Sequence, residues 1–290
     1  MPEILDFGTR LQRAMDSRGR LCVGIDPHPD LLREWGLPEN GEGIRSFGER
    51  VVEAAAGRVG VVKPQVAFFE RYGAAGMEAL AAVQRSAREA GLLVISDAKR
   101  GDIGSTMAAY AQAWLHPDSD FAADALTVSP FLGFGSLEPA IEAAEAYGAG
   151  LFVLALTSNP EGGEVQLARR EGRSVAGQIA SAAAERNIRH SERYDVRDAS
   201  HSGLGHIGLV VGATTASSAR EAGVDVARGL PPLLAPGYGA QGASVADLRE
   251  GFGAAFERQV LVNSSRGILV HGPQRAALAD AIDRAGDDVS

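Results

Sequence analysis

The sequence predicts an α/β protein whose parallel strands close into a (β/α)8 TIM barrel, and three observations support this prediction. Eight short runs are rich in apolar and β-branched residues, and several are separated by Ala-rich segments with apolar residues at i, i+3 and i+4 spacing. The runs are apolar throughout, which is typical of parallel strands covered on both faces. The length of 290 residues suits one such barrel. We expect a single catalytic domain over residues 1–290, with an open doubly wound sheet as the structural alternative.

The predicted elements follow one another in the order that a barrel requires. The strands are expected at residues 21–25, 59–62, 92–96, 125–128, 151–156, 207–211, 233–235 and 260–263. Helical periodicity is present at residues 77–90, 105–115, 137–147, 175–184 and 276–285.

One polar segment, residues 187–205, departs from this alternation and predicts an inserted surface excursion between the fifth helix and the sixth strand. His190, His201 and His206 lie in or beside it, but their spacing matches no compact metal-ligand motif. We therefore expect a solvated loop and no metal site.

The composition excludes several classes of protein. Hydrophobic residues make up 45% and charged residues 22% of the chain, as in ordinary globular proteins, and no apolar stretch is long enough to span a membrane. The net charge of -9 argues against a nucleic-acid binder. The single cysteine, Cys22, excludes a disulfide framework and a Cys-based zinc cluster. The acidic start of the chain, without a basic and apolar leader, predicts a cytoplasmic protein.

Lysine occurs at two positions only, Lys63 and Lys99, among 28 basic residues. Both follow apolar runs, where a solvated surface charge is not expected. An ammonium group is a compact charge whose pKa responds to its surroundings, whereas a guanidinium keeps its proton. The two lysines are therefore candidate catalytic residues. The alternatives are that they are retained by chance in an Arg-rich chain, or that they form partly buried structural ion pairs.

The third predicted strand ends in a run of alternating charges. Asp97 and Lys99 are two residues apart, so an extended backbone directs both side chains to one face, and Asp102 follows beyond the turn. Carboxylates beside an ammonium keep both kinds of group ionised. Lys99 would then stay protonated and could deliver a proton to a carbanion. A structural salt-bridge network is the alternative at this point.

A phosphate site is indicated after the last two strands. Gly237, Gly239 and Gly242 allow backbone N–H groups to approach an anion, and Arg266 offers a planar fork for phosphate oxygens. These loops commonly hold phosphate in (β/α)8 barrels.

The run from Ile95 to Thr106, ISDAKRGDIGST, closely resembles the D-x-K-x-x-D-I-x-x-T signature of the orotidine 5'-phosphate decarboxylase family. The resemblance covers nearly the whole chain. Asp26, the Lys63-Pro64 pair, and the segments 158–160, 236–242 and 265–267 follow in the family's order. The length and the 187–205 segment are similar to the longer bacterial branch (type 2).

The resemblance implies a decarboxylation of orotidine 5'-monophosphate (OMP) to UMP and CO2 that needs no metal or organic cofactor. It implies four catalytic charges, Lys63, Asp97, Lys99 and Asp102, of which Asp102 reaches in from the other subunit of a homodimer. Asp97 would lie against the substrate carboxylate, and Lys99 would protonate the carbanion at C6.

The resemblance also implies the substrate contacts. Asp26 and Lys63 would bind the ribose hydroxyls, with Thr106 contributed by the partner subunit. The remaining contacts would be Ser158 at the pyrimidine amide edge, Pro236 beside the base, and Gln241 and Arg266 at the phosphate.

Three other functions remain open at this point. A decarboxylase of sugar-phosphate keto acids has a related D-x-K-x-x-D element but uses Mg²⁺. A Schiff-base aldolase needs a free amine, which Asp97 and Asp102 would oppose. A non-catalytic sensor of a phosphate ligand would not need a lysine between two carboxylates.

Overall fold

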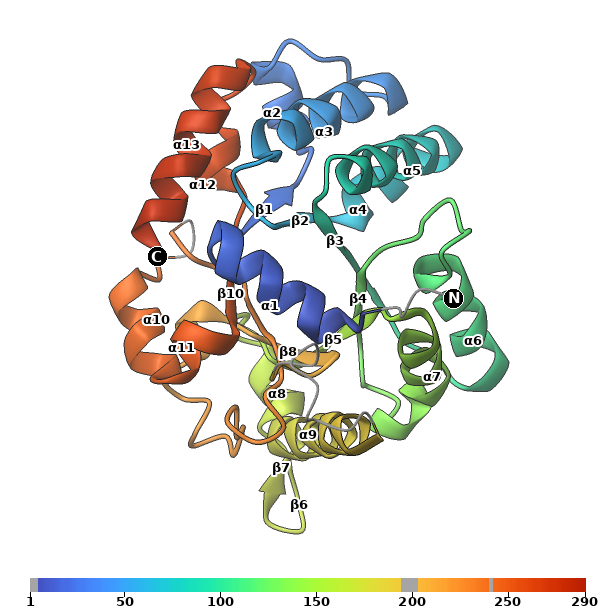
Figure 1. Ribbon diagram of the computed structural model, residues 1–290, viewed down its shortest axis with the longest axis vertical. Helices are drawn as coiled ribbons and strands as arrows, with labels where there is room; N and C mark the ends of the chain where they lie inside the picture. The colour runs from blue at the N-terminus through green and yellow to red at the C-terminus, as the bar shows by residue number, and fades with distance from the viewer. Residues whose placement is uncertain (1–4, 194–202, 240–241) are drawn as a thin grey trace.

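The computed structural model describes residues 5–193, 203–239 and 242–290 (Figure 1). The barrel strands are β1 (Leu21–Ile25), β2 (Val61–Pro64), β3 (Leu93–Arg100), β4 (Ala125–Val128), β5 (Gly150–Leu156), β8 (Ile207–Val211), β9 (Leu233–Ala235) and β10 (Val260–Ser264). They close into a parallel barrel in the order β1–β10–β9–β8–β5–β4–β3–β2. The predicted (β/α)8 barrel is confirmed, and β1, β4, β8 and β9 have the predicted bounds.

Helices surround this barrel (Figure 1). They are α1 (Phe7–Arg18), α2 (Pro29–Glu34), α3 (Gly41–Ala55), α4 (Val66–Glu70), α5 (Gly73–Glu89), α6 (Gly104–Leu115), α7 (Glu138–Tyr147), α8 (Gly162–Gln166), α9 (Val175–Arg193), α10 (Val245–Phe252), α11 (Ala255–Gln259), α12 (Arg266–Leu269) and α13 (Arg275–Asp288). The short 3-10 helix η1 (Phe134–Leu137) precedes α7.

The connection from β8 to β9 is irregular. Among its described residues, the 3-10 helix η2 (Ala213–Thr215) is the only helical element. Gly223 and Gly229 there have φ angles of 74° and 69°, which are left-handed values that favour glycine. Pro231 and Pro232 follow directly and cannot donate backbone hydrogen bonds.

The first helix, α1, closes the amino end of the barrel and crosses in front of the strands in Figure 1. Asp6 caps it by accepting a hydrogen bond from the Thr9 backbone N–H at 3.0 Å. Phe7, Leu11 and Met15 are buried on its inner face and belong to the same apolar cluster as the barrel interior. The barrel therefore has an apolar floor.

The predicted surface excursion over residues 187–205 is wrong for the described parts of that segment. Residues 187–193 are the last turns of α9, and Asn187 is buried. Its amide nitrogen donates to the Ile207 carbonyl at 2.8 Å, and its amide oxygen accepts from the Ile207 N–H at 3.0 Å. Asn187 therefore connects α9 to β8 through two hydrogen bonds. His206 is buried as well, so the expectation of a solvated loop fails there. Residues 194–202, with His201, lie outside the described residues.

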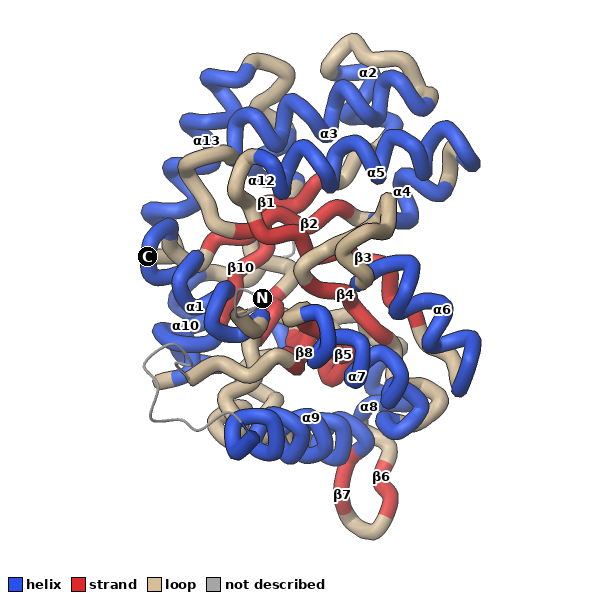
Figure 2. The backbone as a smooth tube through the Cα atoms, turned by 45° about the vertical axis from the view of Figure 1, so that its right-hand side comes forward, coloured by secondary structure: helices blue, strands red, loops and turns tan. Residues whose placement is uncertain are grey.

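A small antiparallel hairpin, β6 (Arg169–Arg170) and β7 (Arg173–Ser174), projects from the body below α9 in Figure 2. None of the helices in the described part of the chain combines the length and apolar character that a membrane crossing needs.

Candidate active site

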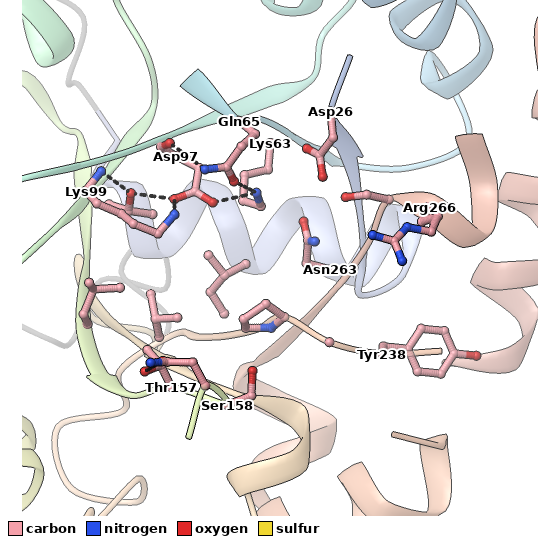
Figure 3. Close-up of a pocket in the computed structure, with 18 of the residues that line it drawn as sticks. Asp26, Lys63, Gln65, Asp97, Lys99, Thr157, Ser158, Tyr238, Asn263 and Arg266 are labelled. Atoms are coloured by element: carbon pink, nitrogen blue, oxygen red, sulfur yellow. Dashed lines mark hydrogen bonds and ion pairs between the residues drawn. The ribbon is translucent and has the colours of Figure 1, made fainter. Parts of the chain in front are cut away.

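A cavity of about 360 Å³ opens at the carboxyl ends of the barrel strands (Figure 3). Its polar lining includes residues at or after the carboxyl ends of six strands: Asp26, Lys63, Gln65, Asp97, Lys99, Thr127, Thr157, Ser158, Asn159, Asn263, Ser265 and Arg266. Leu154, Val210 and Leu234 add apolar side chains from β5, β8 and β9. The carboxyl face is where (β/α)8 barrels carry their active sites.

Two lysines share one carboxylate on one side of this cavity (Figure 3). Lys63 Nζ lies 2.7 Å from Asp97 Oδ2, and Lys99 Nζ lies 2.6 Å from Asp97 Oδ1. The Thr127 hydroxyl donates a third hydrogen bond to Asp97 at 2.9 Å. The structure thus brings together three of the four predicted catalytic charges.

Burial gives this array its electrostatic character. The side chains of Lys63 and Asp97 are 4% and 10% exposed, whereas that of Lys99 is 45% exposed. Burial alone would raise the pKa of Asp97, but the ammonium groups of Lys63 and Lys99 outweigh burial and hold that pKa well below its usual range. Burial would likewise lower the pKa of Lys63, and the carboxylates of Asp97 and Asp26 instead raise it. A charged carboxylate is therefore held inside the cavity, beside an ammonium that solvent can reach.

The backbone at Lys99 is not the regular extended strand that the sequence predicts. Lys99 has a φ of 49°, and the register between β3 and β4 shifts between Ser96 and Arg100. The Lys99 N–H donates to the Thr127 hydroxyl at 2.9 Å, which holds the bulge in place. Such bulges redirect side chains near active sites. Asp97 and Lys99 both line the cavity as predicted, but a left-handed residue achieves it rather than strand alternation.

Arg266 lies on the side of the cavity away from Lys99, as does Tyr238 (Figure 3), and Pro236 also lines the cavity. The close approach of β1 to the loop after β10 needs a glycine, because a Cβ on Gly24 would lie 1.8 Å from the Ser265 hydroxyl. Gln241, the second predicted phosphate ligand, lies outside the described residues.

Asp102 and Thr106 do not line the cavity of their own chain. Asp102 accepts a hydrogen bond from the Ile103 N–H at 2.8 Å, and Thr106 is exposed on the first turns of α6. Asp26 and Ser158, in contrast, do line it.

Sequence reasoning assigned no role to Thr127, Gln65 or Asn263. Thr127 bridges Asp97 and Lys99, and Gln65 accepts a hydrogen bond from Lys63 Nζ at 3.3 Å. Asn263 is buried against the cavity, and its amide oxygen has no hydrogen-bond partner among the described residues. In the sequence, each of these three residues is marked only as a polar residue at or after the end of an apolar strand.

Fold and site together define a class: a (β/α)8-barrel enzyme with a Lys–Asp–Lys array and an arginine on opposite sides of one cavity. Residues 19–281 match the model of the orotidine 5'-phosphate decarboxylase / HUMPS family. The chain belongs to this family, and its enzyme class is that of a decarboxylase, a carboxy-lyase.

Individual relatives extend this match over nearly the whole chain. An orotidine 5'-phosphate decarboxylase of Streptomyces coelicolor is 56% identical over 281 residues, covering 96% of this chain and 95% of the relative. The corresponding protein of Salinispora arenicola is 53% identical, with coverage of 96% and 95%. The crystal structure of a putative orotidine 5'-phosphate decarboxylase from Streptomyces avermitilis has a TM-score of 0.88 and 53% identity, covering 98% of this chain and 94% of that one. The predicted family is confirmed.

Proposed function

We propose that the chain converts OMP to UMP and CO2 without a metal or organic cofactor, and that residues 1–290 act as one catalytic domain. The observation that carries the proposal is the buried Asp97 carboxylate held between Lys63 and Lys99 in a family of this name. This reading is favoured over the Mg²⁺-dependent keto-acid decarboxylase, the Schiff-base aldolase and the phosphate sensor, because the similar relatives carry the name of the OMP enzyme.

The Lys–Asp–Lys array supplies the chemistry. The substrate carboxylate at C6 lies against Asp97, which stays ionised, so repulsion acts on the bound acid and is relieved when CO2 leaves. The C6–carboxyl bond breaks and its electron pair stays on C6. Lys99 stabilises that charge and then transfers its ammonium proton to C6, giving UMP and a neutral amine that regains a proton from water.

The remaining contacts are those that the family resemblance implies, and the order of groups across the cavity is compatible with them. With C6 at Lys99 and the phosphate at Arg266, the ribose lies between them, within reach of Asp26 and Lys63 (Figure 3). Ser158 reads the amide edge of the pyrimidine, and Pro236 packs beside the base. Gln241 would join Arg266 at the phosphate.

We further propose a homodimer in which Asp102 and Thr106 of one protomer complete the site of the other. Their exclusion from their own cavity supports this arrangement. Large apolar side chains lie exposed beside them: Ile103 is 62% exposed, and Phe131 and Leu132, which follow the neighbouring strand β4, are 76% and 54% exposed. Large apolar side chains exposed in this way favour a protein partner. The single, buried cysteine supports a cytoplasmic location, a reducing compartment.

An absorbance assay with OMP in the presence of EDTA tests the proposed function. We expect turnover that EDTA leaves unchanged, with UMP as the product. A reaction that requires added Mg²⁺ would instead favour the keto-acid decarboxylase, and borohydride trapping of a substrate on Lys99 would favour the aldolase.

A further inference from the structure

Three potential metal ligands meet near the amino end of the barrel, away from the cavity. Glu145 comes from α7, His190 from α9, and His206 from the position before β8. One ligand atom from each lies within 4.8 Å of the others. The His206 Nε2 and Glu145 Oε1 atoms are 3.6 Å apart, and the two imidazole rings have centroids 4.2 Å apart. Glu145 and His206, which are 61 positions apart in the sequence, thus lie close together with His190.

His206 lacks the hydrogen bonds that a buried imidazole needs. The residue is 1% exposed, and neither ring nitrogen has a hydrogen-bond partner among the described residues. Its backbone is fixed, because the His206 carbonyl accepts a hydrogen bond from the Leu151 N–H at 3.0 Å inside the barrel sheet. Buried polar groups without a hydrogen bond are destabilising, so an imidazole with none, facing a carboxylate and a second imidazole, points to a ligand between the three groups.

The donor set and its spacing fit a tetrahedral transition-metal ion. Two imidazoles and one carboxylate are a common zinc set with one open position, and bonds of about 2.0 Å place neighbouring ligand atoms about 3.3 Å apart. The 3.6 Å separation of His206 and Glu145 is already close to that value. The second Glu145 oxygen accepts a hydrogen bond from Arg193 at 3.2 Å, which orients the carboxylate as outer-shell partners do in metal sites.

The nearby charges select the kind of ion. Arg193 offsets the charge of Glu145, so a hard cation such as Mg²⁺, which depends on carboxylate oxygens, gains little here. A borderline-soft ion such as Zn²⁺ or Co²⁺ binds imidazole nitrogen strongly.

We propose that Glu145, His190 and His206 bind one zinc-type divalent ion that links α7 and α9 to the start of β8. The site lies at the amino side of the strands, opposite the Lys63–Asp97–Lys99 cavity. In (β/α)8 barrels the amino-terminal face contributes to stability, and the carboxyl-terminal face carries out catalysis. The ion therefore stabilises the fold and takes no part in the decarboxylation.

Titration of the untagged, full-length protein with Co²⁺ tests the site. We expect one equivalent of Co²⁺ to bind with the visible absorption of a tetrahedral complex, Zn²⁺ to displace it, and Mg²⁺ to leave it unchanged. Zn²⁺ should also raise the midpoint of thermal unfolding. Glu145→Gln and His190→Gln should each weaken Co²⁺ binding by about tenfold or more. His271→Gln, which removes an exposed histidine outside the cluster, should bind Co²⁺ as the unaltered protein does.

Glu145→Gln is the decisive variant, because a glutamine oxygen can still accept from Arg193 and the residue is only partly buried. Circular dichroism of the metal-free variants checks their fold. The proposal is overturned if Co²⁺ does not saturate at one equivalent, if its spectrum is octahedral, or if Glu145→Gln and His190→Gln bind as tightly as the unaltered chain.

Discussion

At the scale of single residues, the site depends on the placement of two lysines on one carboxylate. Lys63 is buried and holds Asp97 in the charged form, whereas Lys99 is half-exposed at a left-handed position beside the cavity. The two residues therefore differ in role although they share a partner. In the proposed reaction, Lys63 keeps Asp97 charged, and Lys99, which solvent can reach, is the proton donor.

Lys99→Arg should nearly abolish turnover while leaving UMP binding measurable. The guanidinium keeps its charge but is a poor acid, and a positioned proton donor contributes a factor of about 10² to 10⁴ to the rate. Steady-state assays and UMP titrations measure the two effects separately. A variant with more than a few per cent of the original activity would show that Lys99 is not the proton donor.

Asp97→Asn should destabilise the fold at neutral pH by about 3 kcal/mol, because Lys63 then remains buried without its main counter-charge. The sign of the pH dependence follows from the lowered pKa of Asp97, which burial opposes and the two lysines produce. The stabilisation from Asp97 is complete above its unfolded pKa of about 4 and is lost as pH falls below that value.

Denaturant unfolding of both proteins at several pH values measures this difference. The difference in free energy of unfolding between the unaltered protein and Asp97→Asn should be largest near pH 6 and should decrease below about pH 4. A gap that stays constant with pH would mean that Asp97 is not held ionised by its neighbours.

At the scale of secondary structure, the strands were the predictable part. Each barrel strand contains a buried apolar run, so the residues that predict a strand are adjacent in the sequence, as in β4 and β8. The floor helix α1 could not be placed in this way, since its role depends on contact with Phe152, far along the chain. The same holds for Asn187. Its polarity predicted a loop, because the sequence does not reveal that its hydrogen-bond partner is the backbone of β8.

The floor helix should contribute stability rather than catalysis. Leu11→Ala removes a fully buried side chain under the barrel and should lower the free energy of unfolding by about 2 to 5 kcal/mol, with the turnover number unchanged. Arg13→Ala, an exposed position on the same helix, is the matched control and should change stability by less than about 0.5 kcal/mol. Urea unfolding gives both values, and equal effects would contradict the role assigned to α1.

At the scale of the whole molecule, the cavity of one protomer contains three of the four predicted charges. The predictable part of the site was the set that one chain brings together, since its residues follow predicted strands. In the proposed dimer, the position of Asp102 in the site depends on a second chain, and no pattern within one sequence specifies that packing. The exposed Ile103, Phe131 and Leu132 mark the edge where the second protomer would pack.

Mixing two inactive variants tests the shared site. Lys99→Ala and Asp102→Ala homodimers should each be nearly inactive. If the two chains are unfolded and refolded together, a mixed dimer carries both changes in one site and neither in the other. Random pairing makes about half of the dimers mixed, each with one intact site of two, so about a quarter of the original activity should return. Activity that does not return, in a mixture shown by mass to contain mixed dimers, would refute the shared site and leave the decarboxylase assignment intact.

The apolar floor formed by Phe7, Leu11 and Met15 gives the barrel a blind end. Material can then enter and leave the reaction chamber at its carboxyl mouth alone, as far as the described residues define it. In the proposed reaction, the nucleotide, the CO2 and the water that restores the Lys99 proton therefore all pass through this one opening.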